Sequence, residues 1–274
     1  MKPSRIAIMY DFDKTLCSKD MQEYTFIPNL GIKPIDFWNE ATRLRKEENV
    51  DSVLSYMYLM KHEMEKQNKP LTRTYLKEMG KNVELFDGVK EWFDRINKYG
   101  KKYGIEIEHY IISSGIKEII EGTPIGKKFK CIFASEFYYK KGNAVWPRIA
   151  INYTNKTQYL MRINKGTLDI SDDYSINKKM PNNERRIETT NMIYIGDGIT
   201  DVPCMKLTKE GGGTSIAVYQ NNNIKTAKTL KEDERINYIV PADYKENSPI
   251  DIIVKKKIES ISLCNELKDL SIKN

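Results

Sequence analysis

The sequence has few of the residues from which zinc sites and disulfide frameworks are built. It contains four cysteines, at positions 17, 131, 204 and 264, and two histidines, at positions 62 and 109, in 274 residues. No two cysteines form a C-x-x-C pair. We therefore expect neither a zinc-binding module nor a fold held together by disulfides.

Long apolar runs are also missing. No segment approaches the roughly 20 apolar residues that span a bilayer, so no membrane partner is expected. The apolar run at residues 6–10 is too short for the hydrophobic region of a signal peptide, and no small-residue cleavage site follows it. These absences predict a cytoplasmic protein.

Acidic residues are outnumbered by basic ones. The chain has 45 Lys and Arg against 38 Asp and Glu, which gives a formal net charge of +7. An excess of this size is compatible with nucleic-acid binding or with the attraction of anionic substrates. No basic run is interleaved with aromatic residues as a single-strand binding groove requires. We interpret the charge as a solvated lysine-rich surface and expect no nucleic-acid partner.

Apolar runs alternate with helical patterns along much of the chain. Buried strands are predicted at residues 6–10, 105–112, 131–134, 192–195 and 215–218. A hairpin is predicted at residues 136–139 and 145–151, and helices at 89–99, 157–164 and 250–270. Strands that alternate with helices predict an α/β fold with a doubly wound parallel sheet.

Residues 17–83 have little strand character. Four apolar residues there recur at helical spacing: Val53, Met57, Met60 and Met64. We predict a small helical domain over residues 17–83, inserted into a core domain formed by residues 1–16 and 84–274. The name helical insertion is used below for residues 17–83.

Polar side chains follow three of the predicted strands, at the point where each strand ends. Asp11 and Asp13 follow the first strand, Ser113 follows the second, and Asp197 and Asp201 follow a later one. Because ligands bind beyond the carboxyl ends of parallel strands, we expect these side chains to form one site. Carboxylate oxygens are the ligands that Mg²⁺ prefers, so a magnesium site is predicted there.

The same residue types suit phosphoryl transfer. A carboxylate beside Mg²⁺ can attack phosphorus and form an aspartyl phosphate. A second carboxylate two residues on lies on the same side of an extended backbone, where it can protonate the leaving oxygen and then activate water. A serine hydroxyl, backbone N–H groups and a lysine would hold and neutralise the phosphoryl oxygens.

Four segments, in chain order, resemble the motifs of haloacid dehalogenase (HAD)-like phosphatases. Residues 11–15 match D-x-D-x-T, residues 111–115 resemble the second motif, Lys156 resembles the lysine of the third, and residues 196–201 match G-D-G-x-x-D. The resemblance covers residues 1–16 and about 84–245, and points to the phosphoserine phosphatase-like branch. It implies a Rossmann-like sheet with the helical insertion as the family's C1 cap.

The resemblance also implies roles in the reaction. Asp11 would be the nucleophile and a Mg²⁺ ligand, and Asp13 the general acid and base, with its backbone carbonyl on Mg²⁺. Dehalogenases of the superfamily lack the second aspartate, so Asp13 favours phosphate chemistry. Lys156 would neutralise charge on Asp11 and on the phosphoryl group. Lys165 lies nine residues later and remains a competitor for that role.

Further roles follow for the metal and the substrate. Asp197 would bind Mg²⁺ directly. Asp201 would not touch the metal but would contact the residues that bind Mg²⁺. The alternative is that Asp201 only caps the N-terminus of a helix. The substrate-binding residues would be Thr15, which steadies the first motif loop, together with Ser113 and the N–H of Ser114, which bind phosphate. Ser113 could otherwise be an ordinary turn residue.

Asp20 is the remaining candidate for substrate binding. In relatives that resemble phosphoserine phosphatase, an acid near this position contacts the amine of the substrate, which implies an amine-bearing substrate here. The alternative is an acidic residue in the first turn of a helix.

Three functions stay open at this level. The one favoured is Mg²⁺-dependent hydrolysis of a small phosphorylated metabolite, a phosphate monoester. A phosphotransferase would use the same site with an alcohol in place of water. A catalytically silent basic binding protein is the third, and it gains nothing from keeping Asp11, Asp13, Lys156 and Asp197 together. The sequence does not indicate an oligomeric state.

Overall fold

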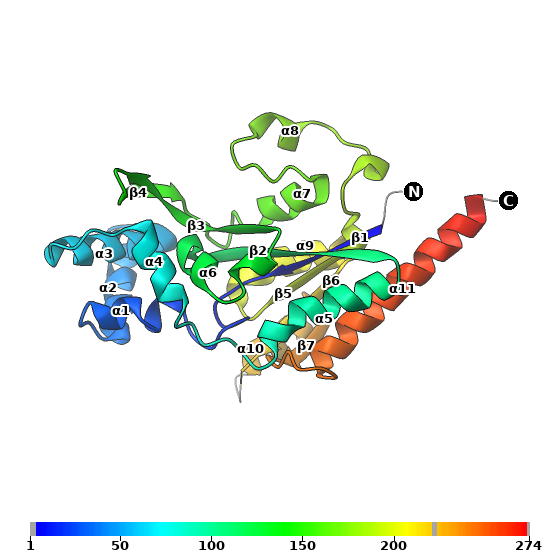
Figure 1. The fold of residues 1–274 in the computed structure, drawn as a ribbon, viewed down its shortest axis with the longest axis horizontal. Coiled ribbons are helices and arrows are strands. Elements are labelled where there is room, and N and C mark those ends of the chain that lie inside the picture. The colour runs from blue at the N-terminus through cyan, green and yellow to red at the C-terminus, as the bar shows by residue number, and fades with distance from the viewer. Residues whose placement is uncertain (1–3, 221–223, 273–274) are drawn as a thin grey trace.

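A seven-stranded sheet forms the centre of the computed structural model, which describes residues 4–220 and 224–272 (Figure 1). The strand order is β4-β3-β2-β1-β5-β6-β7, and all neighbours are parallel except β3 and β4. The predicted doubly wound α/β sheet is therefore confirmed. The strands are β1 (Ser4–Tyr10), β2 (Ile105–Ile116), β3 (Cys131–Lys140), β4 (Asn143–Ile149), β5 (Met192–Gly196), β6 (Thr214–Tyr219) and β7 (Tyr238–Pro241).

The central strand β1 is apolar on both faces and divides the hydrophobic core in two. Its alternate residues Ile6, Ile8 and Tyr10 join one buried cluster, and Ala7 and Met9 join the other. The first cluster lies under α5 (Val89–Lys102) and α11 (Pro249–Ile272). The second lies under α7 (Thr157–Lys165), α9 (Val202–Glu210) and α10 (Lys225–Glu232). Helices on both faces bury the sheet completely at its centre.

The helical content of residues 17–83 is confirmed. The helices there are α1 (Phe26–Asn29), α2 (Pro34–Glu47), α3 (Ser52–Lys66) and α4 (Arg73–Gly80), and they gather beside one edge of the sheet (Figure 1). Helix α3 begins where the carboxylate of Asp51 accepts hydrogen bonds from the N–H groups of Val53 and Leu54. The predicted apolar stripe on α3 is buried. The division into two domains remains a prediction.

Helix α4 packs against α6 (Lys117–Gly122) through two glycines. A Cβ atom added to Gly80 would lie 2.1 Å from the carbonyl oxygen of Ile119, and one added to Gly122 would lie 1.9 Å from that of Lys77. These distances leave no room for a side chain at either position. The two backbones therefore touch directly, which joins the helical insertion to α6 on the sheet.

Several elements differ from the sequence-based expectation. Residues 131–140 form one strand rather than two, because the polar residues Ser135 and Glu136 are buried with hydrogen-bonding partners and do not interrupt it. Strand β2 also continues through the second motif to Ile116. β7, α9 and α10 were not predicted. The shorter helices are α8 (Asp173–Asn177) and the 3-10 turns Met21–Glu23, Gly126–Lys128, Asn182–Glu184, Thr189–Asn191 and Ile199–Asp201.

Among the described helices, none combines the length and the low polarity that crossing a bilayer requires. The longest, α11, has 24 residues and carries charged side chains along its length.

A buried hydrogen-bonded chain lies beneath β1 and fixes the protonation of His109. Trp92 Nε1 donates to the hydroxyl of Tyr10 at 2.8 Å, and this hydroxyl lies 2.9 Å from His109 Nδ1. The hydroxyl therefore donates to Nδ1, which leaves Nε2 to donate to Asn97 Oδ1 at 3.0 Å. Burial lowers the pKa of His109 from 6.5 to about 3, so the folded protein holds a neutral imidazole.

Acidification is expected to destabilise the fold through His109. The unfolded chain takes up a proton below its pKa of 6.5, whereas the folded chain resists protonation down to about pH 3. Stability therefore falls as the pH drops below 6.5, at a rate approaching about 1.4 kcal/mol per pH unit. Urea unfolding at pH 7.5 and 5.5 should show a larger loss for the wild type than for His109→Gln. Equal losses would contradict this assignment.

Candidate active site

A cavity of about 800 Å³ opens at the carboxyl ends of the central strands. Six of the predicted site residues line it: Asp11, Asp13, Asp20, Ser113, Ser114 and Asp197. Lys14, Ser18, Thr200, Tyr219 and Gln220 also line it and were not predicted to belong to the site. Their residue types carry no signal in the sequence, because the cavity is assembled from loops that follow different strands.

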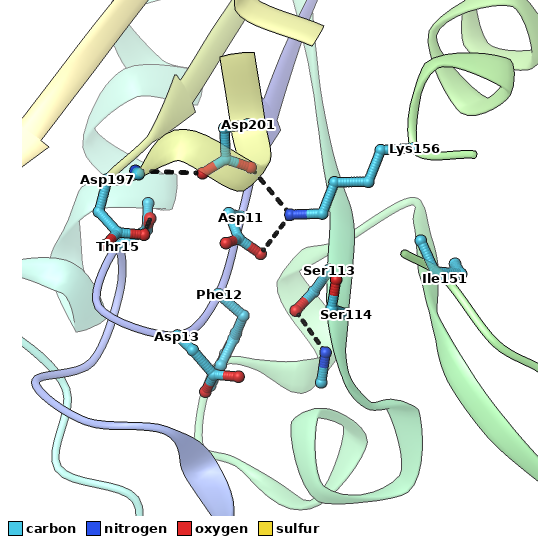
Figure 2. Close-up of polar contacts among 12 residues, drawn as sticks. Asp11, Phe12, Asp13, Thr15, Ser113, Ser114, Ile151, Lys156, Asp197 and Asp201 are labelled. Carbon is cyan, nitrogen blue, oxygen red and sulfur yellow. Dashed lines mark hydrogen bonds and ion pairs between the residues drawn. The ribbon is translucent and has the colours of Figure 1, made fainter. Parts of the chain in front are cut away.

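Asp11 and Lys156 meet at the centre of this site (Figure 2). The Asp11 N–H donates to the carbonyl of Ile195 at 2.9 Å, which fixes the first motif loop against β5. Lys156 Nζ lies 3.2 Å from Asp11 Oδ1 and donates to Asp201 Oδ1 at 2.8 Å. The Lys156 side chain is fully buried. A buried ammonium between two carboxylates balances part of their charge.

Lys165 lies elsewhere. Its Nζ donates to the backbone carbonyls of Ile176 and Lys178, at 2.5 and 2.8 Å. Lys156 is therefore the one of the two competing lysines that contacts Asp11.

Asp201 is fully buried, and its carboxylate accepts several hydrogen bonds. Besides Lys156, it accepts a hydrogen bond from the hydroxyl of Tyr194 at 2.8 Å and from the N–H of Gly198 at 3.5 Å. Tyr194, on β5, was not foreseen, because a tyrosine within an apolar run is usually a core residue. These contacts suit a residue that orients Lys156 and the loop after β5.

The carboxylates of Asp11, Asp197 and Asp201 lie close enough together to form a candidate metal site, with Asp201 also bound to Lys156. One oxygen of each lies within 4.8 Å of the others. Asp11 Oδ1 is buried, and the Lys156 ammonium lies 3.2 Å from it. A cluster of carboxylate oxygens is the kind of donor set that hard divalent cations take.

The electrostatics of the cluster favour added positive charge. Burial, followed by repulsion from Asp201, raises the pKa of Asp11 to about 6 against the opposing effect of Lys156. Burial, followed by repulsion from Asp201 and Asp11, raises the pKa of Asp197 to about 8. Burial alone would lower the pKa of Lys156, but Asp11 and Asp201 outweigh it and raise that pKa. A divalent cation would relieve this crowding of carboxylates.

Asp13 lies on the other side of the first motif loop from Asp197 (Figure 2). Its Oδ1 accepts a hydrogen bond from the N–H of Met21 at 2.8 Å. A Cβ added to Gly115 would lie 2.1 Å from Met21 Cε and 2.9 Å from Asp13 Oδ2, so both side chains lie close against the bare backbone of Gly115. Burial, then Asp20 and Asp11, raise the pKa of Asp13 well above its usual range. A protonated carboxyl can act as a general acid.

Ser113 and Thr15 are both buried but differ in their contacts. Ser113 Oγ accepts a hydrogen bond from the N–H of Gly115 at 3.0 Å, which leaves its own proton available to a ligand (Figure 2). Thr15 Oγ1 donates instead to Asp197 Oδ1 at 3.4 Å, and its carbonyl accepts from the hydroxyl of Tyr244 at 2.9 Å. Thr15 therefore contacts the Asp197 carboxylate and steadies the loop.

Asp20 lies at the wall of the cavity and pairs with Lys14. Lys14 Nζ donates to Asp20 Oδ2 at 2.7 Å. The carboxylate predicted to meet a substrate amine is thus already bound to an ammonium of this chain. Its contact with a substrate amine stays a prediction.

The chain belongs to the haloacid dehalogenase-like hydrolases. The model of that family matches residues 8–206, which include all four motif segments. An uncharacterized protein of Borreliella burgdorferi is 27% identical over 281 residues, covering 92% of this chain and 96% of its own.

Solved structures share the fold. A HAD family hydrolase of Salmonella enterica serovar Typhi has a TM-score of 0.59 at 18% identity, covering 92% of this chain and 71% of its own. A phosphoserine phosphatase with an analogue of its phospho-aspartyl intermediate has a TM-score of 0.56 at 16% identity, covering 92% and 99%. At these identities the likeness is one of fold.

Proposed function

We propose that this protein is a Mg²⁺-dependent phosphatase that hydrolyses a small phosphate monoester through an aspartyl phosphate on Asp11. The observation that supports it most is the cluster of the Asp11, Asp197 and Asp201 carboxylates, with the buried Lys156 ammonium 3.2 Å from Asp11 Oδ1. Membership of a hydrolase family and the shared fold of a phosphoserine phosphatase agree with it.

The residues of the chain divide the work of the reaction. Asp11 attacks phosphorus while Asp13, two residues away, gives a proton to the leaving oxygen. Asp13 then takes a proton from the water that hydrolyses the aspartyl phosphate. Ser113 and the N–H of Ser114 hold phosphoryl oxygens, and Lys156 balances charge as Asp11 becomes an acyl phosphate.

Asp11, Asp197 and the backbone carbonyl of Asp13 would hold the Mg²⁺. When bound, Mg²⁺ supplies electrostatic stabilisation of the negative charge on the phosphoryl oxygens. Asp201 orients Lys156 through their 2.8 Å hydrogen bond.

Hydrolysis of p-nitrophenyl phosphate tests this proposal. We expect phosphate release with Mg²⁺ and none after chelation with EDTA. Product analysis in the presence of glycerol separates the two transfer chemistries, since a phosphotransferase would form glycerol phosphate. No turnover of this ester or of a panel of phosphorylated metabolites would contradict the proposal. A cytoplasmic location remains a prediction.

Mg²⁺ is expected to raise the thermal stability of the protein, because it binds carboxylates that repel one another only in the folded chain. At 100 times its dissociation constant a ligand stabilises the folded state by about 2.7 kcal/mol. The shift in Tm should be lost in Asp197→Asn. The control Asp173→Asn, at an exposed carboxylate on α8, should keep it. An equal shift in all three proteins would place the metal elsewhere.

A further inference from the structure

Two hydroxyl groups converge on the carbonyl oxygen of Ser114, next to the predicted phosphate-binding serine. The Tyr56 hydroxyl, on α3 of the helical insertion, donates to it, and Ser135 Oγ, on β3, donates to it at 3.1 Å. Tyr56 is 6% exposed and Ser135 is fully buried. Tyr56 and Ser114 are 58 residues apart in the sequence. Their hydrogen bond therefore exists only when the helical insertion is seated on the sheet.

The direction of each hydrogen bond follows from the neighbours. Ser135 Oγ accepts a hydrogen bond from the N–H of Ile151 at 3.0 Å, so its proton is directed to Ser114. Tyr56 packs edge-on against Trp38, with ring centroids 6.0 Å apart. The indole Nε1 of Trp38 donates in turn to Glu23 Oε1 at 2.7 Å. These contacts hold both donors against the Ser114 carbonyl.

Holding this carbonyl also sets the orientation of Ser113. The carbonyl of Ser114 and the N–H of Gly115 belong to one planar peptide unit and point in opposite directions. That N–H donates to Ser113 Oγ at 3.0 Å. When Tyr56 and Ser135 fix the carbonyl, the N–H on the far side of the unit is fixed against the serine hydroxyl.

We propose that Tyr56 is a positioning residue that couples the seating of the helical insertion to phosphate binding. With Ser135 it holds the Ser114–Gly115 peptide in the orientation that presents the Ser113 hydroxyl to a phosphoryl group. The proposal rests on the function proposed above. It assigns α3 a part in forming the phosphate site itself, in addition to any role in covering it.

The test uses the full-length wild type, Tyr56→Phe, Ser135→Ala and the double variant. Tyr58→Phe is the matched control, because Tyr58 lies on the same helix and is 54% exposed. Three quantities are measured: KM for p-nitrophenyl phosphate, the inhibition constant of inorganic phosphate, and the Tm shift caused by Mg²⁺.

We expect each single variant to raise KM and the phosphate inhibition constant roughly 3-fold, the effect of one neutral hydrogen bond. The double variant should exceed the product of the two, because either hydroxyl alone still holds the carbonyl. The Mg²⁺ shift should stay as in the wild type, which a general loss of structure would not allow.

Phosphate inhibition unchanged in Tyr56→Phe and in the double variant would overturn the inference while leaving the proposed function intact. A loss of phosphate affinity in Tyr58→Phe equal to that in Tyr56→Phe would also overturn it. A wild type with neither turnover nor a Mg²⁺ shift would instead overturn the proposed function, and the inference with it.

Discussion

Asp11→Asn is expected to lower kcat for p-nitrophenyl phosphate by roughly 10⁴-fold or more, the scale seen when a catalytic nucleophile is removed. An amide has almost the shape of the carboxylate but cannot form the aspartyl phosphate. The substitution also removes one negative charge from a cluster in which repulsion raises the pKa of Asp197. The folded variant should therefore be at least as stable as the wild type without Mg²⁺.

This combination separates catalysis from folding. Urea unfolding and turnover would be measured on the same preparations, with Asp173→Asn as a surface control for the same chemical change. Turnover in Asp11→Asn within 10-fold of the wild type would contradict the assignment of the nucleophile. A variant that loses both turnover and structure would be uninformative on the role, and trapping the phosphorylated enzyme from the wild type would then test it directly.

Lys156→Met is expected to reduce both turnover and stability. Its Nζ is the buried cation between Asp11 and Asp201, so its loss leaves two carboxylates without compensation. Breaking a buried pair in this way costs about 3–5 kcal/mol in the absence of metal. Loss of a charge-stabilising group at the reacting centre lowers kcat by about 10²–10³-fold.

Mg²⁺ should restore part of the lost stability of Lys156→Met, because it brings positive charge to the same carboxylates, but it should not restore turnover. Lys165→Met is the matched control, since Lys165 bonds only to the carbonyls of Ile176 and Lys178 among the hydrogen bonds described for it. Its kcat should stay near that of the wild type. If Lys165→Met were the more damaging of the two, Lys156 would not be the lysine of the third motif.

Much of the sheet could be predicted from the sequence, because its central strands are buried on both faces and read as continuous apolar runs. Residues 6–10 and 192–195 are of this kind, and polar residues mark where each ends. Helix α10 was missed for the opposite reason. Its only buried apolar residues in the described part of the chain are Ala227 and Leu230, too few to establish a period.

Some residues around the site could likewise be predicted from the sequence, and others could not. Asp11 and Asp197 could be found because each lies in a compact motif. Tyr56, Ser135 and Tyr194 could not, because their contacts join segments that the sequence separates. The Tyr56 hydroxyl reaches a carbonyl 58 residues away, and no local pattern marks it. The choice between Lys156 and Lys165 likewise needed the fold.

The glycine contact between α4 and α6 determines how this chain could be recombined with a relative. A crossover at residue 83 would take α4 from one parent and α6 from the other. One parent would then have to supply a glycine at position 80 and the other a glycine at position 122. Exchange of residues 17–122 as one block keeps Gly80 and Gly122 together. A block that preserves this contact therefore extends past the helical insertion to the end of α6.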